Sequence, residues 1–258
     1  MKTARKTLAK LAGLTLMIGL WSATLFAEPV TATRYDNQIQ TTVTQKLSAK
    51  NQFRAVQSSV QDGIVTLMGT VDLYQSKMDA DKLVRKAAHV QGVRNLISVE
   101  GASVPDSELD QKLAQKLRYV REGYDITFDY FALNVKDGVV TVEGQDRTGV
   151  GRDEALADIR NTPGVKDVID NITLEPVSIF DDGLRLRAAR VIYRDSVLSK
   201  YAIDPQRPIR IIVDNGHITL YGSVDSEMDK NVAGIRANQI FGAFSVQNNL
   251  AVENSKKS

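Results

Sequence analysis

The sequence contains no cysteine and only two histidines, His89 and His217. Without cysteine, the chain forms no disulfide and cannot carry the lipid-modified cysteine of a bacterial lipoprotein, so its folded units depend on their apolar cores. Metal centres and activated nucleophiles need clustered ligands or base–nucleophile pairs, which two separate histidines do not supply. We therefore expect no catalytic residue, no metal and no cofactor, and we interpret the chain as non-enzymatic in preference to a hydrolase.

Each histidine has a simple structural interpretation. His89 is expected to close a helix, where the helix dipole favours a basic side chain. His217 falls on a predicted strand, at a surface or edge position, with a pH-sensitive contact as the alternative.

Long apolar runs are also scarce, and the one that exists lies at the N-terminus. Leu11 to Phe26 form an apolar stretch of 16 residues, and Ala27 follows it. Four basic residues precede the stretch: Lys2, Arg5, Lys6 and Lys10. This order is typical of a secretory signal peptide, whereas an uncleaved membrane anchor would need about 20 apolar residues. We predict a signal peptide at residues 1–27 and no membrane span after its cleavage.

An excess of basic residues is missing once the predicted signal peptide is removed. The whole chain has a formal net charge of +2, but residues 28–258 hold 29 basic and 31 acidic residues. Surfaces that bind nucleic acid are strongly basic. The composition therefore argues against nucleic acid as a partner.

One pattern is present three times. Each copy has Asp-Gly or Asn-Gly, then a short apolar run that ends in a second glycine six positions after the first. The pairs are Gly63 and Gly69, Gly138 and Gly144, and Gly216 and Gly222. Asp-Gly and Asn-Gly favour a tight β-hairpin, because both central residues of a type I′ turn need positive φ. The second glycine ends the returning strand or allows close approach of another backbone.

Amphipathic helices flank each predicted hairpin. The first helix of each copy is expected at Asp36–Ala49, Asp106–Tyr119 and Leu184–Leu198, and the second at Tyr74–His89, Gly151–Arg160 and Ser226–Ile240. A last strand is expected at Leu96–Val99, Val168–Ile172 and Val246–Leu250. The predicted fold class is α+β, with three tandem αββαβ units at residues 36–100, 106–175 and 179–253, each a three-stranded sheet covered by two helices.

These motifs resemble the BON domain family, named for an osmotically inducible periplasmic protein and nodulation proteins. The resemblance rests on the hairpin Asp/Asn-Gly-x-Val/Ile-Thr-Leu/Val-x-Gly, on the helix after it, and on a Gly-Val pair that leads into a Val-x-Asn-x-Leu-like strand. The first copy departs from it in having no asparagine at the expected place, and the third has Ala243-Phe244 after its glycine. The resemblance implies an αββαβ fold, a periplasmic location, and binding of phospholipid or support of envelope integrity under osmotic or envelope stress.

Charge is the main functional clue in the sequence. Formal net charges are +2, −6 and zero for the three predicted units. The third unit carries Arg185, Arg187, Arg190 and Arg194 on its first helix, and the first unit carries Lys82, Arg85 and Lys86 on its second helix. A basic stripe beside apolar residues is typical of a helix that meets anionic headgroups. We predict that these residues bind anionic phospholipid, with a solvated helix face as the alternative.

A second function stays open, that of a periplasmic chaperone or an adaptor for other envelope proteins. Small sheets have edges that can accept a strand from a partner. Phe128, Tyr130 and Phe131 lie in the acidic middle unit and could line such a site, although aromatic residues on strands more often belong to a core.

Overall fold

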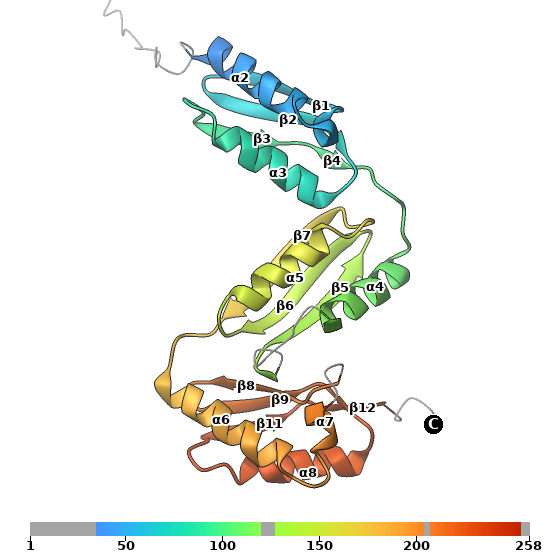
Figure 1. Cartoon of the computed structure of the whole chain (residues 1–258), viewed down its shortest axis with the longest axis vertical. Helices are drawn as coiled ribbons and strands as arrows, with labels where there is room; N and C mark the ends of the chain where they lie inside the picture. Colours follow the sequence, from blue (N-terminus) through green and yellow to red (C-terminus); the bar gives the residue numbers. More distant parts are fainter. Residues whose placement is uncertain (1–34, 120–126, 204–206, 254–258) are drawn as a thin grey trace, which may run out of the picture.

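The computed structural model describes residues 35–119, 127–203 and 207–253. Three α+β units follow one another along the long axis of the molecule, from the N-terminal unit at the top of Figure 1 to the C-terminal unit at the bottom. Each unit contains a helix, a hairpin, a second helix and a last strand in that order, which confirms the predicted fold class. The predicted signal peptide lies outside the described residues. Among the helices of the described segments, none has the length and hydropathy that crossing a bilayer requires.

Unit one comprises α2 (Asp36–Ser48), a short 3-10 turn η1 (Asn51–Phe53), β1 (Val56–Gln61), β2 (Ile64–Val71), α3 (Tyr74–Arg85), β3 (Gly92–Asn95) and β4 (Ser98–Val99). Unit two comprises α4 (Asp106–Tyr119), β5 (Tyr130–Lys136), β6 (Val139–Asp146), α5 (Val150–Arg160) and β7 (Asp167–Leu174). In both, the hairpin is antiparallel and the last strand runs parallel to the second hairpin strand. The second hairpin strand is therefore the centre of each sheet.

Unit three has the same plan with one addition. It comprises α6 (Ile179–Tyr193), α7 (Lys200–Ile203), β8 (Arg210–Asp214), β9 (His217–Tyr221), β10 (Ser223–Val224), α8 (Glu227–Asn238), β11 (Ser245–Asn248) and β12 (Ala251–Val252). β9 is the central strand, antiparallel to β8 and parallel to β11. The addition is α7, before the hairpin. The short parallel pair of β10 and β12 corresponds to the pairing of β2 with β4 in unit one.

Each sheet buries one face against its two helices. Alternate residues of the central strands are fully buried, as in Val65 and Leu67 of unit one. On α2 the buried residues are Ile39, Val43 and Leu47, whose spacing of four places them on one helix face. The buried residues of the strands, two apart, and those of the helices, four apart, thus pack together in one apolar core per unit.

Neighbouring units share core residues at both junctions. Tyr74, the first residue of α3 in unit one, packs in the core of unit two. Phe128, just before β5 of unit two, packs in the core of unit three. Because units of this size are only marginally stable alone, an aromatic side chain borrowed from the preceding unit contributes to the stability of the following one.

An aspartate at the start of the first helix holds the hairpin turn in every unit. The turn residues have positive φ, for example +54° at Asp137 and +79° at Gly138. Their backbone N–H groups donate to the Asp106 carboxylate at 2.7 and 3.0 Å. Asp36 accepts the same pair of hydrogen bonds in unit one, and Asp181 does so in unit three. We call this contact the aspartate clamp.

Some predicted boundaries need correction. α6 begins at Ile179, five residues before the expected Leu184, because the Ser178 hydroxyl caps it by accepting from the Asp181 N–H at 3.2 Å. α3 ends at Arg85, so His89 does not close it. His89 instead has a positive φ of +66° and stacks on Tyr35 with ring centroids 3.8 Å apart.

The last strand of unit one, expected at Leu96–Val99, begins earlier, at Gly92, and only its end at Ser98–Val99 falls in the expected range. Strand pairing makes Gly92 equivalent to Asp167 and Ser245, so His89 occupies the place of Gly164 and Gly242. Asn95 then occupies the place of Asn248, and the asparagine missing from the sequence comparison is present. Both asparagines donate to a carbonyl of the second helix, Lys77 at 2.9 Å and Lys230 at 2.7 Å.

Unit two is the copy that departs from this arrangement. Asp170 stands at the asparagine position and accepts from the Arg152 guanidinium on α5, at 2.5 and 2.9 Å. A carboxylate cannot donate to the helix carbonyl, so an ion pair with Arg152 replaces that hydrogen bond. The pairing contributes to lowering the pKa of Asp170 in spite of its burial.

The aspartate clamp predicts a loss of stability when its carboxylate is removed. Asp106→Ala should lower the free energy of unfolding by about 2 kcal/mol or more, since two hydrogen bonds to a charged acceptor are lost. Chemical denaturation measures the change. Glu108→Ala is the matched control, because Glu108 is exposed on the first turn of the same helix. Equal effects of the two substitutions would contradict the clamp.

Candidate functional site

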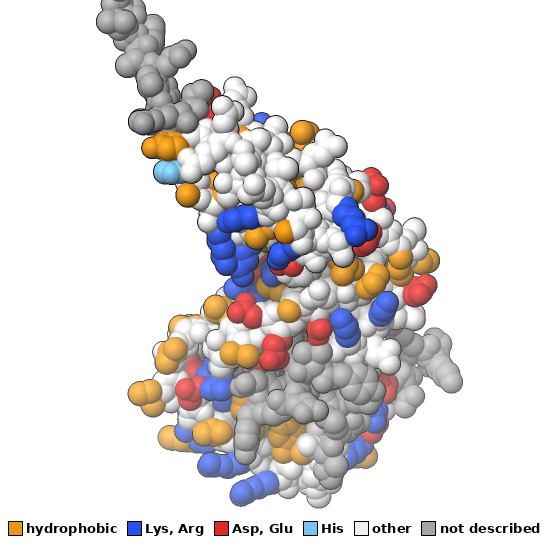
Figure 2. Space-filling model, turned by 45° about the horizontal axis from the view of Figure 1, so that its top comes forward, with side chains coloured by type: hydrophobic (Ala, Val, Ile, Leu, Met, Phe, Trp, Pro, Cys, Tyr) orange, Lys and Arg blue, Asp and Glu red, His pale blue; other side chains and the backbone are white. Residues whose placement is uncertain are grey.

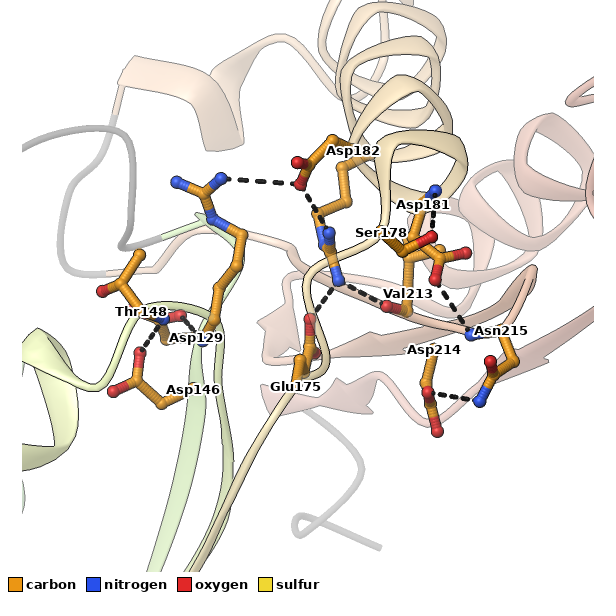
Figure 3. A network of polar contacts seen from close by, with 12 residues as sticks. Asp129, Asp146, Thr148, Glu175, Ser178, Asp181, Asp182, Val213, Asp214 and Asn215 are labelled. Carbon is orange, nitrogen blue, oxygen red and sulfur yellow. Dashed lines mark hydrogen bonds and ion pairs between the residues drawn. The ribbon is translucent and has the colours of Figure 1, made fainter.

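Of the four arginines predicted to bind lipid on α6, Arg185 is buried and cannot meet a membrane surface. It is 2% exposed and lies between units two and three. Its guanidinium pairs with the buried Glu175, donates to the Val213 carbonyl at 2.6 Å, and contacts Asp182 at 2.7 Å. Figure 3 shows these partners converging from the linker, α6 and β8. Arg185 therefore belongs to the junction and not to a lipid-binding surface.

The same junction continues into unit two. Arg147 lies 3.5 Å from Asp182, which is also the partner of Arg185. Burial raises the pKa of Glu175 to about 7, against the lowering effect of the Arg185 charge. The ion pairs of this junction are thus partly shielded from water and fix the linker against α6.

The other three arginines form a stripe along α6. Arg190 and Arg194 are exposed, and Arg187 is half-buried. The Nε atom of Arg187 is buried without a hydrogen-bond partner in the described segments. Arg194 lies about 10 Å further along the helix than Arg187 at 1.5 Å per residue, so the stripe leads away from the start of the helix.

Exposed apolar side chains gather at the start of α6, where sequence reasoning had not placed a site. We call Ile179, Phe180, Phe241 and Phe244 the aromatic patch. Ile179 is 91% exposed, Phe241 89% and Phe244 71%. In Figure 2, hydrophobic and basic side chains lie together along one edge of the lower part of the molecule.

The hairpin turn and Arg187 hold the patch together. Phe180 and Phe244 stack with ring centroids 5.9 Å apart, and both rings lie against Gly216. The position of a Cβ on Gly242 is 3.3 Å from a terminal nitrogen of Arg187 and 3.9 Å from the Phe180 ring. A guanidinium therefore lies beside exposed aromatic rings, which is an arrangement suited to a surface that is apolar and anionic at once.

Comparison of the three units shows that the aromatic residue at position 244 is special to unit three. The Phe244 N–H donates to the carbonyl of Gly216 at 2.8 Å. Gln91 and Lys166 make the equivalent hydrogen bond in units one and two, at 2.9 Å each. The position is therefore polar or charged in two copies and aromatic in the third. Because the surrounding backbone is the same, the fold does not require phenylalanine there.

The basic cluster of unit one lies elsewhere. Lys82, Arg85 and Lys86 are exposed at the end of α3 and face a groove to which unit two contributes Arg160. Unit two separates this groove from unit three along the molecule (Figure 1). The structure thus does not join the two predicted clusters into one surface.

Of the aromatic residues considered for a protein-binding site, two lie at the junction of units two and three and one packs on the core of its own unit. Phe128 is buried in the core of unit three, Phe131 packs on the core of unit two, and Tyr130 stacks on Tyr221 with centroids 4.0 Å apart.

His217 is exposed at the start of β9, where Nδ1 lies 2.7 Å from the Ser245 hydroxyl. In the described ranges, no three His, Cys, Asp or Glu residues come together as metal ligands would.

The family model of the BON domain matches residues 35–101, 105–176 and 194–254. The chain belongs to the BON domain family. In each glycine pair, both with positive φ, the first glycine lies in the hairpin turn. The second allows close approach of another backbone: a Cβ on Gly69 or Gly144 would lie 2.0 or 1.8 Å from a carbonyl oxygen. No curated protein matches the chain.

Two solved structures cover most of the chain at low similarity. The C-terminal domain of CdsD, a structural protein of the type III secretion system of Chlamydia trachomatis, is 14% identical over 81% of this chain and 94% of its own, with a TM-score of 0.24. The periplasmic domain of the inner membrane protein PrgH from S. typhimurium is 11% identical over 81% of this chain and 98% of its own, with a TM-score of 0.20. At these scores the likeness implies nothing further about the BON chain.

The raised pKa of Glu175 predicts a pH-dependent junction. Its folded pKa of about 7 exceeds the usual 4.5, so the folded protein holds a proton that the unfolded chain releases between these values. Stability that is present below pH 4.5 is therefore lost as the pH rises to about 7. Glu175→Gln cannot ionise, so the wild type should lose stability relative to this variant across the window.

Urea unfolding at several pH values measures this difference. Glu143→Gln, at an exposed position of unit two, is the control and should follow the wild type. Parallel curves for wild type and Glu175→Gln would contradict the prediction.

Proposed function

We propose that this BON protein is a peripheral binder of anionic phospholipid in the bacterial periplasm, where it supports envelope integrity under stress, and that unit three makes the contact. The observation that carries the proposal is the aromatic patch beside Arg187. The periplasmic location rests on the predicted signal peptide and on family resemblance. Binding, and not catalysis, is the function proposed.

The apolar part of the contact comes from side chains that are now in water. Transfer of a large apolar side chain from water into an apolar surrounding is worth about 1.5–3 kcal/mol. Phe241 and Ile179, each about nine-tenths exposed, have most of this energy still to gain. Insertion of the aromatic patch at the headgroup boundary would supply it.

The charged part comes from the stripe on α6. A basic residue near an anionic leaflet contributes about 1 kcal/mol, and the effect falls off within a Debye length. Arg187 adjoins the aromatic patch, and Arg190 follows on the same face one turn later. Insertion of the aromatic patch and attraction of the arginines to anionic headgroups together give reversible, salt-sensitive binding.

The acidic charge of unit two limits how the molecule approaches the surface. Residues 106–175 hold nine basic and 15 acidic residues, so an anionic surface repels this unit. The aromatic patch belongs to unit three and lies at the start of α6, directly after the linker from unit two (Figure 1). Contact through the patch therefore has to keep the body of unit two off the surface.

Flotation with vesicles tests the proposal. The chain should float with phosphatidylglycerol vesicles at low salt, and weakly with neutral phosphatidylcholine or at high salt. Phe241→Ser with Phe244→Ser should reduce partitioning by about tenfold or more, since each lost ring removes apolar transfer energy. Charge reversal of Arg187, Arg190 and Arg194 to Glu should abolish the preference for anionic lipid.

Two matched controls lie in unit one. Leu96→Ser removes an exposed apolar side chain, and Arg94→Glu reverses an exposed charge, both away from the aromatic patch. Neither should change flotation. Absence of flotation with any lipid would overturn the proposal, and suppression of client aggregation in lipid-free solution would then support the adaptor or chaperone function.

A further inference from the structure

A groove between units one and two is formed by residues that no single unit holds. α3 of unit one and its C-cap Lys86 supply Asp79, Asp81, Lys82, Arg85 and Lys86, and α5 of unit two supplies Arg160. The two helices pack together at this point, with Tyr74 of α3 in the core of unit two. Figure 2 shows basic side chains around a notch below the upper part of the molecule.

The acidic side chains of the groove already have hydrogen-bond partners. Asp81 accepts from Arg85 at 2.5 Å, and Asp79 accepts from the Gln75 amide at 2.8 Å. No side-chain hydrogen bond or ion pair joins Lys82, Lys86 or Arg160 to another residue in the described part of the chain. The groove thus has four basic side chains against two carboxylates, which leaves an excess of positive charge.

Basic residues at the C-terminal ends of α3 and α5 are favoured by the helix dipole, but placing several of them together costs free energy. Lys82 and Lys86 are four residues apart, and like charges at this spacing destabilise a helix by a few tenths of a kcal/mol. The Nε atom of Arg160 is buried without a hydrogen-bond partner in the described segments, so packing and not an acceptor holds its guanidinium. An anion in the groove would relieve the repulsion between the lysines.

We propose that this groove binds a phosphate group, with Arg160 of unit two and Lys82 and Lys86 of unit one as its ligands. A planar guanidinium offers two parallel donors to phosphate, and each lysine adds a mobile point charge. Because the donors come from both units, a bound phosphate strengthens the junction between them. The site is separate from the aromatic patch and does not rest on phospholipid binding by unit three.

Titration of the purified chain with inorganic phosphate and with glycerol 1-phosphate tests the site. Calorimetry at matched ionic strength should show saturable binding, with NMR shifts at the Arg160 side chain. Arg160→Gln and Lys86→Gln should each weaken binding by about tenfold, since each removes a charged donor. Lys86 is exposed, so its substitution leaves the packing intact.

The controls separate this site from the aromatic patch. Lys112→Gln changes an exposed lysine of unit two outside the groove, and Phe241→Ser with Phe244→Ser removes the aromatic rings. Neither should alter phosphate binding. Loss of vesicle flotation in Arg160→Gln would identify the phosphate as a lipid headgroup, and unchanged flotation would identify a soluble phosphorylated solute.

Two results would overturn the proposal. One is the absence of saturable phosphate binding. The other is equal binding by wild type, Arg160→Gln and Lys86→Gln. In either case the cations would serve only to offset the negative ends of α3 and α5.

Discussion

The aspartate clamp is the contact on which each unit depends. It joins the start of the first helix to the turn of the hairpin, and thereby fixes how that helix lies on the sheet. The turn needs this partner because positive φ at both central residues turns their N–H groups away from the strands. In unit three the clamp also builds the candidate site, since Asp181 on Gly216 brings Phe180 against Phe244. A contact that organises the core therefore places the aromatic patch as well.

Junctions between units follow from the small size of each core. Tyr74 and Phe128 pack in the core of the unit that follows them. Neighbouring units are therefore packed against each other and are not independent domains. Arg185 with Glu175 adds a buried ion pair at the second junction. Breaking such a pair leaves a charge buried, so it favours one geometry even where its net contribution to stability is small. The grooves and surfaces between units are accordingly fixed features of the molecule.

The sequence predicted what is local and missed what depends on distant residues. Hairpins and amphipathic helices follow from Asp-Gly turns and from periodicity, so the fold class was correct. The last strand of unit one was shifted because Gly92-Val93 imitates the Gly-Val pair, while His89 holds the true glycine position with positive φ. Arg185 lies on the same helix as Arg187, and its position on that helix does not show that it is buried. Its burial follows from contacts with Glu175 and Val213, which are distant in the sequence. Phe180 and Phe244 are 64 residues apart, and no periodicity connects them.

Three copies of one backbone show which residues the fold does not require. Phe244 replaces a polar residue of the other units, and Asp170 with Arg152 replaces an asparagine. The first change exposes aromatic area, whereas the second replaces a hydrogen bond to a helix carbonyl with an ion pair. Unit two also lies between the aromatic patch and the groove at Arg160 along the molecule (Figure 1). That separation places the groove away from the patch that would insert, which favours a soluble phosphorylated solute over a headgroup bound together with the patch.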